Sequence, residues 1–519
     1  MERKWSTLIV VSLATFMLLL DVTIVNIALP SMERSLHANF SDLQWVVDAY
    51  ALTLAAFLLV SGSVADLVGR RMVFVAGLAL FSAASLLCGL AQDPTMLSVS
   101  RGIQGVGGAM MFATTLALIA QVFHGADRAV AFGILGAVTG ASVAVGPLIG
   151  GVLTEGLTWR SIFFVNVPIG IGAIIVTLRS VHESKDPSPY GIDWVGAATF
   201  SGALALLVLA LIRVQADGWT SNLIVSCLVG AAVLLGVFVI TELRHKNPLF
   251  DLSLFRKPAF CGVSSTAFVI ASAMFAMFLY ITLYLQNLLG FSALKAGVVF
   301  LPITVVSFIV APIAGRLSQR VPARFFLSVG LLLIGIGLAL MAHVKVDSAW
   351  TVLLPGFLIA GVGIGMINPP MASAAIAVVP PQRSGMASGI NSTFRMVGLA
   401  GGIAVLGIVF QARIESKIEM LLRGTPVANH ATQIAQAVAT GAGTASQPGA
   451  SAHTKAIVSA AIRQAFTGTL NELFVIGAVV SVIGAVVAAL TVRAKDFVAS
   501  RGAASGGATE HGVEAVAVL

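Results

Sequence analysis

The sequence predicts an all-α polytopic membrane protein, and its composition and long apolar runs are the observations that predict it. Of its 519 residues 58% are hydrophobic and only 10% are charged, and the mean hydropathy is +0.98. A soluble domain carries about 25% charged residues, and a soluble globule of this length could not cover such a chain with polar surface. Disordered chains are poor in apolar residues, so disorder is excluded too. We expect a multi-pass protein of the cytoplasmic membrane.

Fourteen apolar stretches are long enough to cross a bilayer as helices, which takes about 20 residues each. They cover 6–30, 43–62, 72–91, 96–121, 129–155, 160–180, 194–213, 221–242, 259–287, 294–315, 324–343, 350–371, 384–410 and 469–492. The first stretch is too long for a signal peptide, contains Asp21 and lacks an A-x-A cleavage site. We expect it to be retained as the first span.

The distribution of Lys and Arg predicts the orientation. With fourteen spans, more than half of the 30 basic residues fall on the side that holds both termini, including Arg70, Arg71 and the linker 244–257. The short loops on the other side hold few. Cytoplasmic loops carry the excess of basic residues, so we expect both termini in the cytoplasm. This rule also explains the net charge of +8 more simply than nucleic-acid binding does.

The spans divide into two six-helix bundles with two additional spans between them. We expect an N-terminal bundle over 1–185, two further spans with linkers over 186–257, and a C-terminal bundle over 258–500. Within the last part, 411–468 is rich in Ala, Gly, Thr and Ser and predicts a long extracytoplasmic loop, with short helices near 431–440 and 455–466. Residues 501–519 predict a flexible cytoplasmic tail.

A weak internal repeat supports two related halves. Gly62–Arg71 joins the second and third spans, and the similar Gly315–Arg324 joins the tenth and eleventh. Two related six-helix halves are typical of transporters. In the first copy, Asp66 is placed to cap a helix N-terminus, and Arg70 to pair with Asp127. Such contacts would lock the two bundles together on the cytoplasmic side. The alternative is that the charges of this loop only set the orientation of the protein in the membrane.

Ionisable side chains inside the spans are the first candidates for function, because each costs roughly 2.5–3.5 kcal/mol to insert. Asp21 lies in span 1 near Asn26, Asp48 lies early in span 2, and Arg101 and Gln104 lie three apart on one face of span 4. We interpret Asp21, Asp48 and Arg101 as proton-coupling residues. The alternative is that Asp21 or Asp48 simply pairs with Arg101 and has a structural role. A structural role is also the alternative for Arg395 in span 13.

Two further patterns fit a transporter but also fit ordinary packing. Span 9 carries Met and aromatic side chains, among them Phe278, Tyr280 and Tyr284, that would suit bulky, varied ligands. We assign them to substrate binding together with Asn26, Gln104, Asn368 and Arg395. Span 5 has a glycine face that ends in a proline, which favours close helix approach and a bend. We assign conformational gating to Gly62, Asp66, Gly69, Arg70, Asp127, Gly146, Pro147 and Gly150.

Several chemistries have no signature in the sequence. There is no P-loop G-x-x-x-x-G-K-[ST] and no G-x-S-x-G or H-E-x-x-H motif. The three cysteines, Cys88, Cys227 and Cys261, all fall in apolar stretches and form no metal-binding spacing. We expect no enzyme activity, no metal and no cofactor, with the proton gradient as the energy source.

These motifs together resemble one family over about residues 6–495. Leu20–Pro30, Gly62–Arg71, Arg101–Gly108, Gly140–Gly151 and Trp159–Gly170 are similar, in order and spacing, to motifs of the fourteen-span drug/proton antiporters of the major facilitator superfamily. The resemblance implies the major facilitator fold, proton coupling through Asp21 and Arg101, and export of lipophilic compounds, cations among them, by alternating access. It implies small-molecule substrates, protons and the lipid bilayer as partners, with a functional monomer and no nucleic acid.

Three departures from the family pattern narrow this expectation. Leu67 stands where the loop motif usually has a basic residue, and Gln319 stands at the acid position of the second copy. No acid occurs between Gly385 and Phe410, which argues against polycations as substrates. Export or flipping of a lipid or of a single metabolite stays open as an alternative, as does a non-transporting sensor or scaffold.

Overall fold

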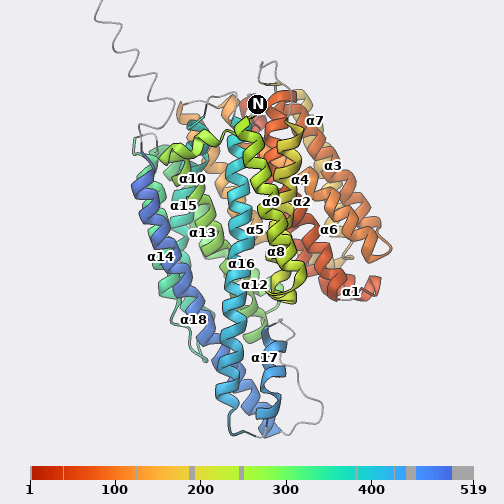
Figure 1. Cartoon of the computed structure of the whole chain (residues 1–519), viewed down its shortest axis with the longest axis vertical. Helices are drawn as coiled ribbons and strands as arrows, with labels where there is room; N and C mark the ends of the chain where they lie inside the picture. Colours follow the sequence, from red (N-terminus) through yellow and green to blue (C-terminus); the bar gives the residue numbers. More distant parts are fainter. Residues whose placement is uncertain are drawn as a thin grey trace, which may run out of the picture.

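The regular structure is entirely helical in the residues that the computed structural model describes, which are 3–38, 40–123, 125–185, 193–244, 250–318, 320–379, 384–425, 427–439 and 452–493. The predicted tail 501–519 lies outside them. We call the end of the molecule at which α1 begins the N face, and the other end the distal face (Figure 1).

The first group of helices is formed by the N-terminal part of the chain. It comprises α1 (Arg3–Leu36), α2 (Phe40–Val68), α3 (Arg70–Leu90), α4 (Pro94–Val122), α5 (Gly125–Gly156), α6 (Ser161–Phe164) and α7 (Asn166–Ser180). Their apolar faces enclose cores built from residues such as Leu18, Phe74, Phe81 and Phe163.

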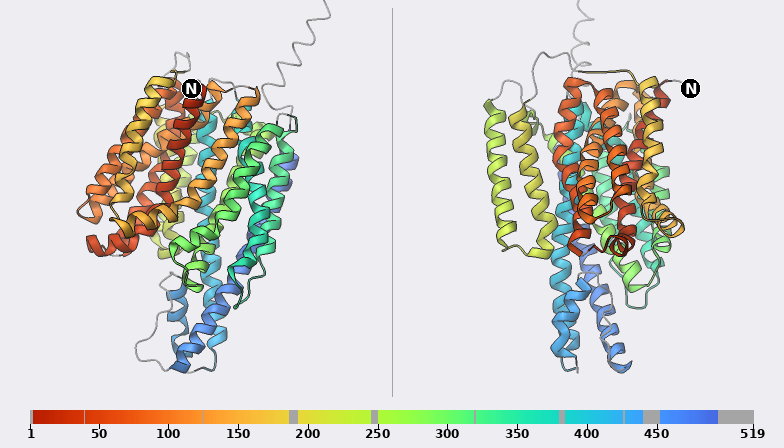
Figure 2. Two further views of the ribbon diagram at one scale, coloured as in Figure 1. Left: turned by 180° about the vertical axis from the view of Figure 1, so that it is seen from behind. Right: turned by 90° about the vertical axis from the view of Figure 1, so that its right-hand side faces the viewer.

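Two helices follow at the side of the molecule, α8 (Trp194–Asp217) and α9 (Asn222–Arg244). Figure 2 shows this pair standing apart from the rest, with α8 on the inner side. α8 packs on α2 and on α16, so the pair covers the seam between the two helix groups.

The second group comprises the helices α10 (Pro258–Ile270), α11 (Ala276–Leu283), α12 (Ala293–Val299), α13 (Leu301–Leu317), α14 (Ala323–Met341), α15 (Leu354–Ala377), α16 (Ser384–Leu422), α17 (Ala431–Ala439) and α18 (Ala452–Thr491). Two π-helical segments, Ala271–Phe275 and Tyr284–Leu288, interrupt the predicted span 259–287. Short 3-10 turns precede α10, α15 and α17, at Leu252–Arg256, Trp350–Leu353 and Ala428–His430.

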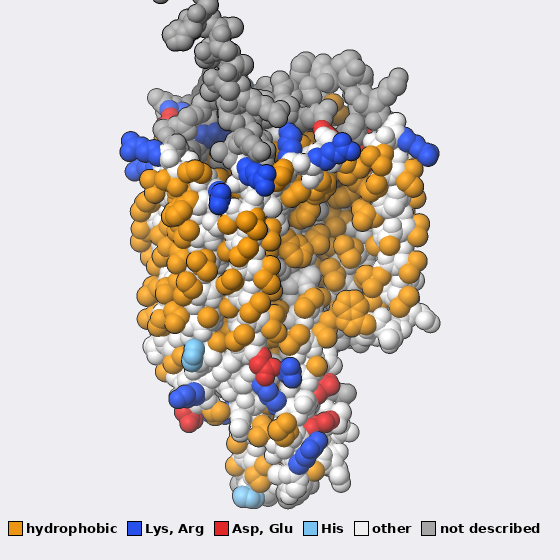
Figure 3. Space-filling view, turned by 60° about the vertical axis from the view of Figure 1, so that its left-hand side comes forward, with side chains coloured by type: hydrophobic (Ala, Val, Ile, Leu, Met, Phe, Trp, Pro, Cys, Tyr) orange, Lys and Arg blue, Asp and Glu red, His pale blue; other side chains and the backbone are white. Residues whose placement is uncertain are grey.

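Twelve helices in the described part of the chain are long and apolar enough to cross a membrane. The remaining two predicted spans correspond to α5 and to the pair α12–α13, whose apolar stretches Val130–Thr139 and Leu301–Leu317 are shorter. The predicted span 294–315 is divided at Phe300, since Pro302 has no N–H for a continuing helix and instead suits a first turn. Fourteen spans therefore stay a prediction. Figure 3 shows the apolar belt, with Lys and Arg gathered at its N-face rim.

The segment predicted as a loop over 411–468 is largely helical in its described residues. α16 runs on to Leu422, α17 lies close to the expected short helix, and α18 begins at Ala452 instead of 469. These parts form a protrusion at the distal face (Figures 1 and 2). Ile414, Ile418 and Leu422 recur every four residues and are fully buried, so they hold the extension against its neighbours.

The two groups approach closely at positions without side chains. A Cβ on Gly133 of α5 would lie 2.9 Å from Cα of Pro312 in α13. A Cβ on Gly389 of α16 would lie 3.1 Å from the carbonyl oxygen of Leu58 in α2. Small residues let helices pack backbone to backbone in lipid, and here they do so across the interface between the groups.

Candidate functional site

Asp21 and Arg101 form a buried ion pair in the first helix group. The pair joins α1 to α4, and both residues are only 1% exposed. Gln104 lies one turn after Arg101 and donates to Asp21 Oδ1 at 3.0 Å, while its own carbonyl accepts from Arg101 Nη1 at 2.7 Å. Charges in a dry interior are tolerated when they are paired and hydrogen-bonded, as these are.

Three more helices complete the surroundings of this pair. Asn166, the first residue of α7, lies 3.4 Å from Asp21 Oδ1 and 3.0 Å from Ser85 Oγ of α3. From α2, the Val46 carbonyl accepts from Arg101 Nε at 3.1 Å, and the Tyr50 ring lies 4.1 Å from the guanidinium carbon. The Asp21 network thus draws on α1, α2, α3, α4 and α7. We use "Asp21 network" for Asp21, Tyr50, Ser85, Arg101, Gln104 and Asn166.

Asp48 lies apart from the Asp21 network. It is on α2, its side chain is half-buried, and no hydrogen bond or ion pair joins it to Asp21 or Arg101 among the described residues. Its predicted role in proton coupling would therefore require a second site. The structure instead brings Gln104, predicted as a substrate contact, into the network, where it is fully buried.

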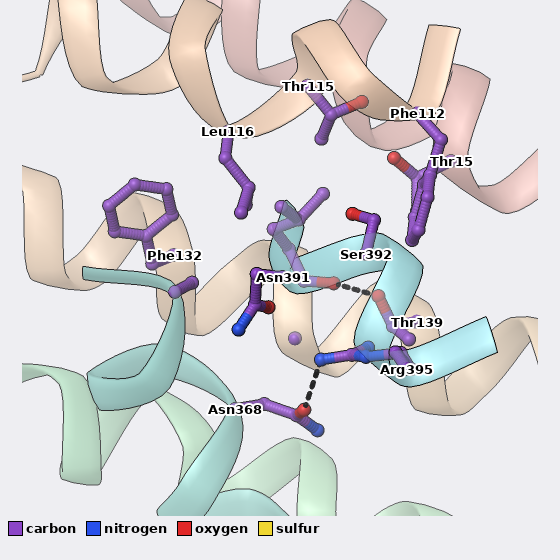
Figure 4. Close-up of a pocket in the computed structure, with 13 residues that line it drawn as sticks. Thr15, Phe112, Thr115, Leu116, Phe132, Thr139, Asn368, Asn391, Ser392 and Arg395 are labelled. Atoms are coloured by element: carbon purple, nitrogen blue, oxygen red, sulfur yellow. Dashed lines mark hydrogen bonds between the residues drawn. The ribbon is translucent and has the colours of Figure 1, made fainter. Parts of the chain in front are cut away.

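A cavity lies between the two helix groups. It is lined by Thr15 of α1, Phe112, Thr115 and Leu116 of α4, Phe132, Leu135, Gly136 and Thr139 of α5, Asn368 and Ala372 of α15, and Asn391, Ser392 and Arg395 of α16. Figure 4 shows Arg395, Asn391 and Asn368 gathered on one side of the cavity, with Thr15, Phe112, Thr115 and Leu116 on the other.

Arg395 and Asn368 were predicted as substrate contacts, and both line this cavity. Arg395 Nη2 lies 3.4 Å from Asn368 Oδ1. Asn391, one helical turn before Arg395, is 4% exposed, and its Nδ2 has no hydrogen-bond partner among the described residues. The cavity therefore combines a guanidinium, an unsatisfied amide donor and aromatic walls.

The aromatic residues predicted from span 9 do not line the cavity. Phe278 packs on Phe275 and Phe300, Tyr280 donates to the Ile403 carbonyl at 2.9 Å, and Tyr284 lies 3.4 Å from the Ser348 carbonyl. They belong to the core of the second helix group, because this face of the helix turns toward α16 and α18. The Asn26 side chain lies outside the described residues.

At the N face, Asp66 connects the two helix groups. Its Oδ1 pairs with Arg70 at 2.8 Å, and its Oδ2 accepts from the backbone N–H of Met386 at 2.9 Å, in the first turn of α16. An acid at a helix N-terminus satisfies a free N–H and complements the helix dipole. The expected capping contact is thus present.

The expected pair between Arg70 and Asp127 is not formed. Asp127 lies 2.9 Å from Lys4 at the start of α1, so it ties α5 to α1 within the first group. Arg70 instead pairs with Asp66, which lies four residues before it in the sequence and is therefore nearer than Asp127. Gly69 occupies this turn with φ of 134°, a region open to glycine, and the Glu183 carboxylate lies against it.

The glycine face of α5 lies against α1. A Cβ on Gly146 would collide with the Thr23 side chain, two residues after Asp21. Gly150 and Gly62 are also buried, whereas the Pro147 side chain lies outside the described residues. Further along α5, a Cβ on Gly136 would lie 3.1 Å from Asn368 Cβ. α5 is therefore in contact with the neighbourhood of the Asp21 network and with the cavity.

Sequence reasoning did not assign Ser85, Asn166 and Tyr50 to the proton-coupling set, nor Thr15, Thr139, Asn391 and Ser392 to the cavity. The spacing of Asn391 and Arg395 by four residues was an available signal, because it places both on one helix face. Ser85 and Asn166 had no such signal, since only the packing of α3 and α7 brings them to Asp21.

The apolar helices, the buried ion pair and the cavity between two helix groups define a multi-pass membrane transporter. The profile of the Major Facilitator Superfamily matches residues 11–403. The chain belongs to this superfamily, whose members transport and are not enzymes.

Several similar proteins have names that describe drug resistance, drug efflux or antibiotic transport. The chain is 37% identical over 414 residues to the multidrug resistance protein Stp of Mycobacterium tuberculosis, covering 80% of this chain and 77% of Stp. It is 35% identical to the probable actinorhodin transporter of Streptomyces coelicolor, covering 79% and 72%. It is 35% identical to the drug efflux pump JefA of Mycobacterium tuberculosis, covering 79% and 81%.

Among solved structures, the human organic anion transporter MFSD10 (TETRAN) has a similar fold. The TM-score is 0.58 at 14% sequence identity, and the match covers 92% of this chain and 99% of that one. At this identity the likeness concerns the fold alone.

Proposed function

We propose that this protein is a drug/proton antiporter that exports lipophilic compounds by alternating access. In this proposal fourteen helices span the cytoplasmic membrane, with α5 and α12–α13 completing the set, and the N face is cytoplasmic. The basic rim at the N face supports this orientation (Figure 3). The drug efflux proteins among the relatives support the substrate class.

The observation that carries the proposal is the Asp21 network. The carboxylate is 1% exposed and is held by Arg101, Gln104 and Asn166. A proton on Asp21 neutralises the acid and ends its ion pair, while Arg101 keeps Gln104 Oε1 and the Val46 carbonyl as acceptors. Protonation thus ends the ion pair between α1 and α4 and leaves the buried charge of Arg101 without a counterion, which favours a different packing of these helices.

Coupling requires that proton and substrate favour different packings of the same helices. α5 is suited to connect them through α1, because Gly146 packs on Thr23, two residues after Asp21 on another face of α1, and Gly136 packs on Asn368 at the cavity. The hydrogen bond between Asp66 and Met386 joins the two helix groups at the N face, and in this proposal it breaks when that face opens. One proton moving down 100 mV supplies about 2.3 kcal/mol, so the cycle needs no cofactor and one monomer suffices.

The test uses the full chain in proteoliposomes with an imposed pH gradient and a pH-sensitive dye in the lumen. Ethidium and a panel of neutral and anionic lipophilic compounds are added to wild type, Asp21→Asn and Asp48→Asn. We expect substrate-induced proton release from wild type and none from Asp21→Asn, because Asn cannot exchange a proton. Asp217→Asn is the matched control, since Asp217 pairs with Arg213 at the end of α8, apart from the network.

The outcomes separate the alternatives. Undiminished proton release in folded Asp21→Asn contradicts the assignment of Asp21. Loss of release in Asp48→Asn would establish a second proton site on α2. No release with any compound contradicts drug/proton antiport and favours a lipid or a single metabolite, which a lipid-transfer assay with the same vesicles then distinguishes from a non-transporting protein.

A further inference from the structure

The strongly polar side of the cavity offers hydrogen-bond donors. Arg395 contributes a guanidinium, and Asn391 contributes an amide NH2 without a partner among the described residues. Asn368 accepts from Arg395 through Oδ1, which leaves its own NH2 to donate. The threonine hydroxyls of Thr15, Thr115 and Thr139 already donate to carbonyls of their own helices. Within the described lining, the donors that remain free are those of Arg395, Asn391 and Asn368, so this side of the cavity favours a ligand group that accepts hydrogen bonds.

The charge of the cavity is positive. No Asp or Glu occurs among its described lining residues, and Arg395 forms no ion pair with any described residue. Arg101, in contrast, has Asp21 as its counterion. A half-buried guanidinium with only an amide oxygen at 3.4 Å is poorly compensated, and a negatively charged ligand group is the missing partner.

The rest of the cavity is apolar. Phe112, Leu116, Phe132, Leu135 and Ala372 line it, and two of them are aromatic. Such walls bind the hydrophobic body of a ligand and leave orientation to the few polar groups. The enclosed space is small in this packing, at about 40 Å³, so a compound of drug size is admitted only when the two helix groups move apart.

We propose that the cavity selects amphiphilic organic anions, with an aromatic body and one carboxylate or phenolate held by Arg395 and Asn391. The inference rests on the proposed export function. It specifies the charge of the substrate, which that proposal left open. Cationic compounds are disfavoured here because Arg395 repels them and no acid in the described lining attracts them.

The test compares two xanthene dyes of similar size and opposite charge, the anion fluorescein and the cation rhodamine 6G. Binding to the full-length protein in nanodiscs is measured by fluorescence polarisation, and export by the same protein in proteoliposomes. We expect fluorescein to bind more tightly. Arg395→Gln should weaken fluorescein binding about tenfold to hundredfold, as expected for loss of a hydrogen bond to a charged group, and should not weaken rhodamine 6G binding. Arg395→Glu should reverse the order of the two dyes.

Two further variants make the result specific. Asn391→Leu removes the unsatisfied donor without changing the charge and should weaken fluorescein binding about fivefold. Arg413→Gln removes the same charge from the protrusion, where Arg413 pairs with Glu472, and should leave both dyes unaffected. A thermal melt of each variant shows whether it is folded. If Arg395→Gln does not fold, the comparison of wild type with Asn391→Leu tests the proposal.

The possible failures are distinguishable. Export of rhodamine 6G that depends on Asp21, without binding of fluorescein, overturns the anion inference and leaves the antiport proposal standing. Fluorescein binding that is equal in wild type and Arg395→Gln also overturns it. If neither dye nor any compound of the panel binds or moves, the proposed function falls together with the inference.

Discussion

Two arginines lie inside the spans of this protein, and their surroundings are opposites. Arg101 is enclosed within one helix group, 1% exposed, with Asp21 as its counterion and Gln104 and Val46 as further acceptors. Arg395 lies at the cavity between the groups, where its hydrogen-bond partner among the described residues is the amide oxygen of Asn368. The first environment is complete without a ligand, and the second is not. The difference separates the site that we propose for protons from the site that we propose for solutes.

The largest expected effect on stability comes from removing Arg101 from its ion pair with Asp21. Arg101→Ala leaves the buried carboxylate of Asp21 without its counterion, which should destabilise the fold by about 3–5 kcal/mol. Arg395→Ala should cost about 1 kcal/mol or less, because it removes one long hydrogen bond and no ion pair. Thermal unfolding of the detergent-solubilised variants measures both. Equal melting temperatures would contradict the contrast between the two arginines.

The next effect concerns the helix that lies between the two sites. Gly146→Ala should reduce transport severalfold and stability by about 1–3 kcal/mol, because the added methyl group meets Thr23 beside Asp21. Gly151→Ala is the matched control on the same helix, since its Cβ would have no neighbour within 4 Å. Export assays on both variants check this. Similar losses in the two would remove the argument for α5 as the connection.

A smaller effect is expected at the N face. Asp66→Ala removes the acceptor of the Met386 N–H and the partner of Arg70, so the first turn of α16 should be destabilised by about 1–2 kcal/mol. Hydrogen exchange should rise there, at residues 386–390. Glu183→Ala is the control, because Glu183 caps α3 within the first group, through the N–H groups of Arg71 and Met72. Unchanged exchange at α16 in Asp66→Ala would contradict a closing role.

The smallest effect belongs to charges outside both sites. Glu472 pairs with Arg413 at 3.0 Å and Lys417 at 2.8 Å on the protrusion, where all three side chains are accessible. Exposed pairs contribute about 0.2–1 kcal/mol, so Glu472→Gln should shift the melting temperature slightly and leave export intact. An export defect in this variant would give the protrusion a part in transport that the comparison of the two arginines does not include.

The sequence was sufficient for the class of fold and for singling out Asp21 and Arg101, because apolar length and the cost of buried charge act locally. It left open whether Asp21 or Asp48 pairs with Arg101. Asp21 and Arg101 stood out as charges in apolar runs, and the structure joins them. The cavity was predictable only in part. Arg395 and Asn368 stood out as polar residues in spans, whereas Thr15 and Thr139 bond to their own helices and have no distinguishing pattern.

The failures also have a physical cause. Tyr280 and Tyr284 have the composition of a ligand surface, but which face of a helix meets its neighbours depends on rotations that the sequence does not specify. The helical extension beyond Phe410 was missed because Gln411–Leu422 is too polar for a span. Its buried residues Ile414, Ile418 and Leu422 nevertheless repeat with the helical period, and that was the signal to use.

α16 is one unbroken helix, so it can tilt as a rigid body. One helix carries the N-face contact at Met386, the cavity donors Asn391 and Arg395, and the protrusion residue Ile418, over about 48 Å at 1.5 Å per residue. A tilt of this rod about its contacts with α10 moves its two ends in opposite directions. A spin label near Ile418 would therefore report, outside the bilayer, the arrival of a solute at Arg395.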